Sequence, residues 1–356
     1  MKTSWVKIVL PVLCTAVMAC GAGCAVKKAQ VPEGYSPVLT KTPAETTTAE
    51  TASTEEETSE EVENIMPEFP FTFTDSVGHE ITLQAYPEKT AVLFSSYAQI
   101  WKESGGFVDV TVGDSVKRGF ASEDAILVND GAGLKFDMEL LVASEPDFVI
   151  VTADFSSQAE ACEALNEMGI PCAAFREENM EDYLSILKIF TDLNGRQDLY
   201  EELGIQVREE INTIRKELKE DLEKRGILDG PSYLFIRAGS AFNSTKAKTA
   251  EDHFACVILD EIGLHNIADD EELLTEELSL ETILTKDPDR ILIVPQGDEE
   301  AVRAYIEELF TSEGWSSISA VQDGRYCFLD KELFNYKPNS RYAEAYCELI
   351  DLIYGE

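Results

Sequence analysis

The residues best suited to bind a ligand are basic and aromatic side chains in predicted loops of a chain whose net charge is −39. Arginine offers a planar fork of donors, lysine a point charge, and aromatic rings supply flat apolar walls. Any one of these cations could equally pair with a neighbouring carboxylate, but the set favours a cleft for an anionic small molecule. The candidate ligand contacts are Tyr97, Trp101, Arg118, Arg237, Lys246, Tyr336, Lys337 and Arg341.

Signatures of catalysis are mostly missing from the sequence. There is no GxxxxGK[ST] phosphate loop and no HExxH, and the segment AGSAF (238–242) lacks the second glycine of a GxSxG elbow. The three histidines are widely spaced, so no multi-histidine metal site is expected. A carboxylate pair for hydrolysis cannot be singled out among 68 acidic residues. We therefore predict a binding protein that is not an enzyme and holds no cofactor or metal of its own.

A short unit occurs twice in the chain, as FDMELLVASEPDFVIV (136–151) and as LSLETILTKDPDRILIV (278–294). Each copy has a capping residue, a glutamate, an apolar helical run, Pro-Asp and an aliphatic strand. Glu139 in the first copy corresponds to Glu281 in the second. An acid in the first turn of a helix gains about 0.3–1 kcal/mol from the helix dipole, which alone could explain both glutamates. The alternative is that each glutamate contacts a basic socket on a partner.

Short aliphatic strands alternate with helical patterns in both halves of the chain, which predicts parallel α/β layers. Before them, FTFTDSVGHEITL (71–83) predicts two strands around a turn at Ser76-Val77-Gly78. A helix with Thr249 and Asp252 at capping-box spacing is predicted over TAEDHFACVILDEIG. Ligands of such sheets bind beyond the carboxyl ends of the strands, where most of the basic and aromatic loops lie. The strands are typified by TAVLF (90–94), DFVIVTA (147–153) and SYLFIRA (232–238).

A helical region, 179–226, separates the two halves and ends at Gly226, a plausible C-cap. Its second part would form a helix roughly 40 Å long, more than one small lobe needs. Coiled-coil pairing is the rival interpretation, but no heptad is sustained. We predict one long helix joining two Rossmann-like α/β lobes, 69–178 and 227–356, with the ligand cleft between them.

The N-terminal residues predict export and anchoring. Residues 1–19 hold Lys2, Lys7 and an apolar run too short to span a bilayer, as in a secretory signal. The motif VMAC resembles a lipobox and assigns lipidation to Cys20, with Cys24 as the alternative; an ordinary cleaved signal is the other possibility. Residues 20–68 are acidic and Thr/Glu-rich and predict a disordered tether. We expect an extracytoplasmic protein, lipid-anchored on the outer face of the cytoplasmic membrane.

The remaining cysteines do not indicate a disulfide framework, and the charge argues against a nucleic-acid-binding protein. Five cysteines follow the tether and none forms a CxxC pair, so buried free thiols are expected and a single disulfide remains open. The net charge of −39 argues against a nucleic-acid partner. The cysteines are Cys162, Cys172, Cys256, Cys327 and Cys347.

From about residue 70 onward the chain resembles the substrate-binding lipoproteins of bacterial ABC importers for ferric siderophores, haem and cobalamin. The resemblance rests on the order and spacing of TDSVGHEITL, the two repeated units, GLHNIADD (263–270), DGRYCFLD (323–330) and FNYKPNSRYAEAY (334–346). It implies a monomeric periplasmic-binding-protein fold, two lobes joined by a long helix, that serves a permease dimer and its ATPase subunits. It also implies that Glu139 and Glu281 are the glutamates, one per lobe, that dock onto permease arginines.

The same resemblance ranks the ligands. KPNSRY and AGSAFNSTKAK are similar to cleft segments of iron-complex binders, which makes Arg237, Lys246, Lys337 and Arg341 the expected anion contacts. A ferric siderophore comes first. Haem is second, with Tyr97 or Tyr336 as axial ligand, and cobalamin third, because it would need more aromatic residues and fewer cations. A surface-tethered hydrolase or chelatase-like enzyme on the same two-lobed plan is the alternative from another class.

Overall fold

The computed structural model describes residues 64–355, apart from the side chains of Glu272 and Leu273. The predicted signal at 1–19, the lipidation cysteines Cys20 and Cys24, and the tether up to residue 63 lie outside the described residues. Asn64 Oδ1 accepts a hydrogen bond from the backbone of Asp198, and the backbone N–H of Ile65 donates to Gln197. Contacts with the fold therefore begin before residue 69. Within the described range, no helix combines the length and apolar composition needed to cross a membrane.

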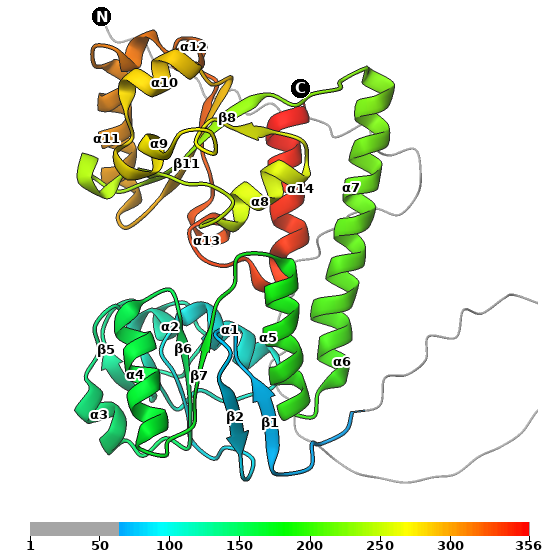
Figure 1. The fold of residues 1–356 in the computed structure, drawn as a ribbon, viewed down its shortest axis with the longest axis vertical. Helices are drawn as coiled ribbons and strands as arrows, with labels where there is room; N and C mark the ends of the chain where they lie inside the picture. Colours follow the sequence, from blue (N-terminus) through cyan, green and yellow to red (C-terminus); the bar gives the residue numbers. More distant parts are fainter. Residues whose placement is uncertain (1–63, 356) are drawn as a thin grey trace, which may run out of the picture. The chain divides into compact units, whose positions relative to one another are not determined.

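The first lobe is built on a five-stranded sheet in the order β5-β4-β3-β6-β7, and every pair of neighbours is parallel. The central strands are buried throughout, as expected for a parallel sheet with helices on its faces. This confirms the predicted α/β class. The strands are β3 (Thr90–Val92), β4 (Val110–Val112), β5 (Ile126–Asn129), β6 (Phe148–Thr152) and β7 (Cys172–Phe175); the helices are α1 (Ser95–Glu103), α2 (Gly113–Lys117), α3 (Met138–Ala143) and α4 (Ser156–Glu167) (Figure 1).

The second lobe has its own sheet, with parallel strands in the order β10-β8-β11-β12 and β9 antiparallel to β8. Its strands are β8 (Ser232–Ala238), β9 (Lys246–Ala247), β10 (His265–Asn266), β11 (Arg290–Pro295) and β12 (Tyr326–Phe328). Its helices are α8 (Phe254–Glu261), α9 (Glu272–Glu277), α10 (Leu280–Lys286), α11 (Glu299–Thr311), α12 (Ser319–Gln322), α13 (Lys331–Phe334) and α14 (Tyr342–Tyr354), with 3₁₀ turns at Phe242–Ser244, Trp315–Ser317 and Asn339–Arg341.

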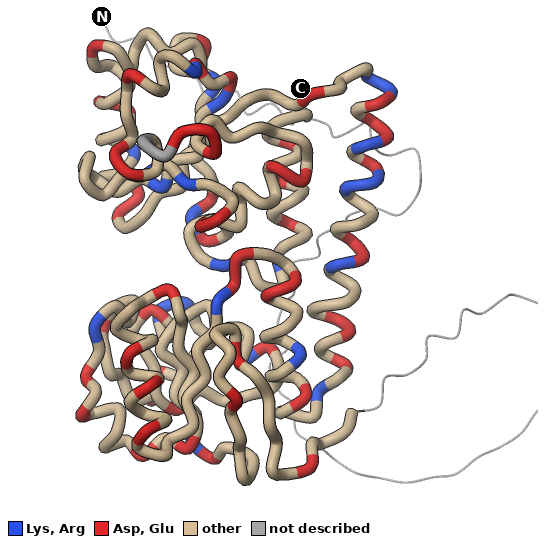
Figure 2. Tube along the Cα trace, viewed as in Figure 1, with Lys and Arg blue, Asp and Glu red and all other residues tan. Residues whose placement is uncertain are grey.

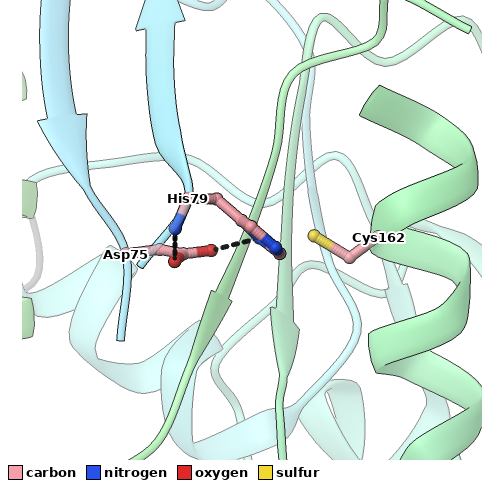
Figure 3. A group of neighbouring side chains, drawn as sticks. All are labelled: Asp75, His79 and Cys162. Carbon is pink, nitrogen blue, oxygen red and sulfur yellow. Dashed lines mark hydrogen bonds and ion pairs between the residues drawn. The ribbon is translucent and has the colours of Figure 1, made fainter. Parts of the chain in front are cut away.

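The predicted hairpin forms an antiparallel pair, β1 (Phe71–Thr74) and β2 (Glu80–Leu83), with Gly78 at a positive φ in the turn. Asp75 shapes that turn because its Oδ1 accepts hydrogen bonds from the backbone N–H groups of Val77 and His79. Its Oδ2 accepts from the backbone of Ala174 in β7, which fastens the hairpin to the first lobe. Figure 3 shows Asp75 with its two side-chain neighbours.

The two lobes are joined by α5 (Met180–Leu193) and by a run of helix made of α6 (Gln197–Tyr200), a π-helical turn (Glu201–Ile205) and α7 (Gln206–Arg225). The predicted stop is confirmed, because Gly226 caps α7 in the left-handed conformation. The π turn was not predicted, and it brings Gly204 against Leu184 of α5 so closely that a Cβ there would lie 2.8 Å from the leucine side chain. We call the run from Gln197 to Arg225 the strut.

The strut contacts α5 and two helices of the second lobe. Tyr183 on α5 donates a hydrogen bond to the carbonyl of Leu203 (3.1 Å), and α7 packs against α14. Arg215 on α7 forms an ion pair with Glu261 at the end of α8 (3.2 Å). Figure 2 shows acidic and basic residues interleaved along α7, as expected for a helix with one face in solvent.

The repeated unit folds the same way in each lobe: α3 leads into β6, and α10 leads into β11. Glu145 and Asp287, at corresponding places before the proline, both have positive φ (53° and 43°). The aspartate after each proline accepts a hydrogen bond from the backbone near the start of a neighbouring strand. Asp147 accepts from the backbone N–H of Lys89 before β3 (3.0 Å), and Asp289 from that of Ser232 at the start of β8 (2.9 Å). The Pro-Asp pair thus aligns neighbouring strands.

Candidate functional site

A cavity of about 260 Å³ lies between residues of the two lobes. The first lobe contributes α1 and the loop after α2, and the second contributes α13 and the segment that leads into α14. The cavity is therefore where the sequence predicts a ligand, between two α/β units. Its lining consists of Gln99, Arg118, Phe120, Glu332, Lys337, Pro338 and Arg341.

Arg118 is the cation with the most contacts at the cavity. Its guanidinium lies 3.8 Å from the ring centre of Tyr336 and 4.8 Å from that of Phe120, and Nη1 donates to Ser95 Oγ (2.9 Å). The side chain is 12% exposed, and this burial lowers the pKa of Arg118. Glu332 Oε2 lies 3.5 Å from Nε, too long for an ordinary hydrogen bond. The buried Nε–H is therefore left without a good acceptor.

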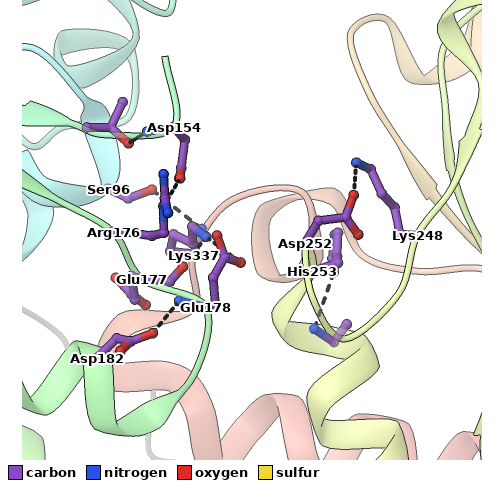
Figure 4. Close-up of polar contacts among 12 residues, drawn as sticks. Ser96, Asp154, Arg176, Glu177, Glu178, Asp182, Lys248, Asp252, His253 and Lys337 are labelled. Carbon is purple, nitrogen blue, oxygen red and sulfur yellow. Dashed lines mark hydrogen bonds and ion pairs between the residues drawn. The ribbon is translucent and has the colours of Figure 1, made fainter. Parts of the chain in front are cut away.

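Lys337 is held by the first lobe (Figure 4). Its Nζ donates to the backbone carbonyl of Glu177 and pairs with the carboxylate of Glu178 at 3.2 Å. Glu177 is fully buried, and burial raises its pKa to about 8, against the opposing effects of Lys337 and of the hydrogen bond from Tyr342. A group with that pKa is largely protonated at pH 7, so the charge of Lys337 is balanced chiefly by Glu178.

Two other predicted anion contacts are also occupied by protein groups. Arg341 lines the cavity but forms a two-point contact with Glu344, at 2.7 and 2.8 Å. Lys246 donates to the backbone carbonyl of Glu276 (2.5 Å) and is not among the residues that line the cavity. Arg341 therefore has its charge paired, whereas Lys246 keeps a charge that is unpaired among the described residues but lies outside the cavity lining.

Arg237 differs from the other cations. Its Nε donates to the amide oxygen of Asn335 (3.2 Å), and no described carboxylate forms an ion pair with it. Burial lowers its pKa, while Asp252 and Tyr336 oppose that effect. A half-buried guanidinium with only a neutral partner is a good donor for an incoming oxygen. Arg237 is, however, outside the residues that line the cavity in this conformation.

Tyr97 and Trp101 do not line the cavity, so the prediction that they contact the ligand is corrected. Both lie on α1 and are 0% and 1% exposed. Tyr97 packs edge-on against Phe94 and Phe175, and the indole N–H of Trp101 donates to the carbonyl of Phe107 (2.7 Å). The face of α1 that carries both residues packs against the sheet, so the two rings belong to the hydrophobic core of the first lobe. Tyr336 is also outside the lining residues, but its ring stacks on Arg118, which is one of them.

Sequence reasoning missed the contacts that connect the segment 337–341 to α1. Asn339 is fully buried, and its Nδ2 donates to the carbonyl of Ser96 (3.0 Å) and to the side chain of Gln99 (3.0 Å). Ser340 donates to Glu103 at 3.1 Å. The sequence held part of the signal, because asparagine tolerates positive φ better than most residues do. In the structure Asn339 has a φ of 53°.

Other charged residues near the cavity also occur as pairs, which Figure 4 shows on both sides of the view. Asp154 lies 3.0 Å from Arg176 in the first lobe, and Asp252 lies 2.5 Å from Lys248 in the second. No feature of the sequence distinguished these pairs from surface charges elsewhere. Together with Glu178 and Lys337, they leave this region close to charge balance.

Glu139 and Glu281 occupy the same position in the two copies of the repeated unit. Each is the second residue of its helix, α3 or α10, and each is exposed. The predicted caps form, with Asp137 accepting from Leu140 N (2.9 Å) and Ser279 from Thr282 N (3.5 Å). Among the described residues, neither glutamate carboxylate forms an ion pair. Both are therefore available to a partner.

The fold is similar to that of known binding proteins, although the sequence has no significant match among curated proteins. SirA from Staphylococcus aureus, in complex with staphyloferrin B, is 15% identical with a TM-score of 0.59, over 80% of this chain and 97% of that one. The heme-binding protein RhuT from Roseiflexus sp. RS-1, in apo form, is 17% identical with a TM-score of 0.61, over 75% and 98%. The vitamin B12 binding protein BtuF of Vibrio cholerae is 15% identical with a TM-score of 0.60, over 75% and 97%.

At these identities the similarity shows a shared fold and no more. The sequence itself matches the family described as periplasmic binding protein over residues 91–333, which is more than half of the chain. The protein therefore belongs to the periplasmic binding protein family, whose members are extracytoplasmic, non-enzymatic substrate-binding components of ABC importers.

Proposed function

We propose that this protein captures a ferric siderophore between its two lobes and delivers it to an ABC permease. The observation that carries the proposal is the buried Nε–H of Arg118, a residue that lines a cavity shared by both lobes; this N–H has no acceptor at ordinary hydrogen-bond distance. An unsatisfied buried donor costs about 1–3 kcal/mol. A ligand oxygen placed there would recover that energy.

The cavity chemistry supports an oxygen-rich ligand. Ferric siderophores present carboxylate, hydroxamate or catecholate oxygens around the metal, and Arg118, which lines the cavity, offers donors to such oxygens. Glu332 is mostly exposed (59%), so a ligand could displace it from Arg118 without disturbing the core. The volume of about 260 Å³ is below the usual range for ligand pockets, roughly 300–1,000 Å³, so we expect small side-chain movements on binding.

Haem is the second candidate, because two of the similar structures are those of heme-binding proteins. Its support is weaker here. Tyr97, one of the two tyrosines suggested as an axial ligand, is in the core, and Tyr336 is stacked beneath Arg118. Cobalamin stays third, since the cavity lining contains one aromatic ring, Phe120.

Delivery requires a membrane partner. We propose that Glu139 and Glu281 contact basic sockets on the two halves of a permease dimer, which works with ATPase subunits. Their equal places in the two lobes suit a partner with two-fold symmetry. We further propose that Cys20, or else Cys24, carries the lipid that holds the protein at the outer face of the membrane.

The test is a thermal-shift and calorimetric screen of the purified protein against ferric siderophores of several chemistries, haem, cobalamin and bare metal ions. A ligand at about 100 times its Kd should add about 2.7 kcal/mol, or several degrees in Tm. Arg118→Ala should weaken binding of the active ligand at least about tenfold.

Arg303→Ala is the matched control. Arg303 also stacks on an aromatic ring (Phe328, 4.2 Å) and pairs with a glutamate (Glu299, 3.3 Å), but it lies on α11 and not at the cavity. Binding of haem or cobalamin in preference to every siderophore would replace the first candidate. Binding that survives Arg118→Ala unchanged would remove the cavity from the proposal.

A further inference from the structure

Asp75, His79 and Cys162 form the one group of three potential metal ligands in the described part of the chain. One ligand atom of each lies within 4.8 Å of the others. Asp75 and His79 belong to the hairpin turn between β1 and β2, and Cys162 belongs to α4. The group is separate from the cavity and takes no part in the proposed function.

The turn holds its two ligands in place before any ion arrives. Asp75 is buried and is fixed by backbone N–H groups of Val77, His79 and Ala174. Its Oδ2 lies 3.2 Å from His79 Nδ1. Two ligand atoms about 2.0 Å from a tetrahedral zinc ion stand roughly 3.3 Å apart, so this pair already has the spacing of two adjacent ligands.

Cys162 completes the group from the opposite side. Its sulfur is fully buried and points toward the imidazole (Figure 3); it accepts a hydrogen bond from the amide of Asn166 at 3.7 Å and has the thiol of Cys172 as a further neighbour. The geometry selects Cys162, because its sulfur, and not that of Cys172, lies within 4.8 Å of ligand atoms of both Asp75 and His79.

We propose that Asp75, His79 and Cys162 bind a zinc ion through one oxygen, one nitrogen and one sulfur. These are the three donor types that zinc takes in proteins, and a water molecule would be the fourth ligand. The imidazole is 41% exposed, which gives that water a place and the ion a route in from solvent. The sequence predicted no metal site, because its three histidines are far apart; this site uses only one of them.

The bound ion would join the hairpin to α4. The hairpin is already linked to the sheet by Asp75 and Ser76 and by the ring of Phe73, which packs on Phe148 and Phe175; the ion would add a connection to α4. The alternative is that the three residues only stabilise the turn and bind no metal. In its favour, the Asp75 carboxylate already has four hydrogen bonds, three from backbone N–H groups and one with His79. Zinc binding would require His79 to release its contact with Asp75.

The experiment uses Co²⁺ as a visible substitute for zinc. Titration of the reduced, metal-free protein should give a near-ultraviolet thiolate-to-cobalt charge-transfer band, which one equivalent of Zn²⁺ should abolish. Cys162→Ser should remove the band. His79→Gln, which keeps an amide able to reach Asp75, should weaken Zn²⁺ binding at least about tenfold.

Two controls separate this site from other thiols. Cys256→Ser changes a buried cysteine of the second lobe, and Cys172→Ser changes the neighbour of Cys162; both should retain the band. Circular dichroism and Tm without metal establish that each variant is folded, and a Zn²⁺-dependent rise in Tm should be lost in His79→Gln. Absence of the band, or a band that persists in Cys162→Ser, would overturn the proposal.

Discussion

Glu177, a single residue at the lobe junction, should make the stability of the protein depend on pH. Its carboxyl group is buried, is faced by Lys337, Tyr342, Glu178 and Asp182, and has a pKa near 8. A raised folded-state pKa means that the folded protein holds this proton more tightly than the unfolded chain does. The resulting stability is present below the unfolded pKa of about 4.5 and is lost as the pH rises toward 8.

Glu177→Gln should therefore make stability less dependent on pH. The amide keeps the shape of the protonated acid and cannot ionise, so the variant should gain Tm relative to wild type at pH 8, by roughly several degrees, and little at pH 5. Calorimetry at the two pH values checks this. An equal change at both would mean that Glu177 is charged in the folded protein.

Single residues also mark the limits of sequence reasoning. The loop after β3 was predicted to present Tyr97 to the ligand, but α1 begins at Ser95, and the helical period then turns Tyr97 and Trp101 to the core. The helix predicted to begin near Thr249 begins instead at Phe254, with the ring of His253 accepting from Ala255 N as its cap. Neither outcome follows from local propensity, since packing against the sheet decides both.

Among the elements, the strut depends on close packing at its π turn. Gly204 has Leu184 and Leu187 side chains 2.8 and 3.1 Å from where a Cβ would stand. Gly204→Val should therefore destabilise the protein by about 1–3 kcal/mol through overpacking. Urea unfolding measures this, with the exposed neighbour Glu202→Ala as control; equal stability of the two variants would show that α5 and the strut separate easily.

The two helices of the repeated unit make a prediction about transport. Reversing charge at both Glu139 and Glu281 to arginine should reduce uptake at least about tenfold, because like charges would meet at the proposed permease contacts. Ligand affinity should stay unchanged, since both residues lie outside the cavity lining. Uptake in a strain that lacks the native protein, together with Kd, separates the two effects.

The matched control reverses two other exposed glutamates, Glu163 on α4 and Glu307 on α11, one in each lobe. Uptake should survive this change. If the control and the Glu139/Glu281 variant lose uptake equally, net charge and not docking is responsible.

On the scale of the whole molecule, alternation of strands and helices, the repeated unit and Gly226 were enough to predict two α/β lobes and a connecting helix. The binding site was harder to predict from the sequence, because the cations at the cavity pair with residues that are distant in the chain. Lys337 meets Glu178, and Arg118 meets Glu332, across the two lobes. A sequence displays the cations but not the carboxylates that neutralise them.

This pairing predicts the charge of the preferred ligand. The three cations that line the cavity, Lys337, Arg341 and Arg118, each lie beside a carboxylate. We expect ferric complexes of zero or one negative charge to bind more tightly than trianionic ones, with affinity falling little between low and physiological salt. Isothermal titration across such a panel would refute this if the trianionic complex bound best.

The hydrogen bond between Asn339 and Ser96 joins residues 243 positions apart. During synthesis and export, α1 therefore appears long before the side chain that bonds to its first turn. The polar contacts between the first turns of α1 and Asn339 therefore form only after the second lobe has been made. Until then the side-chain carbonyl oxygen of Gln99 lacks this donor and can accept from water.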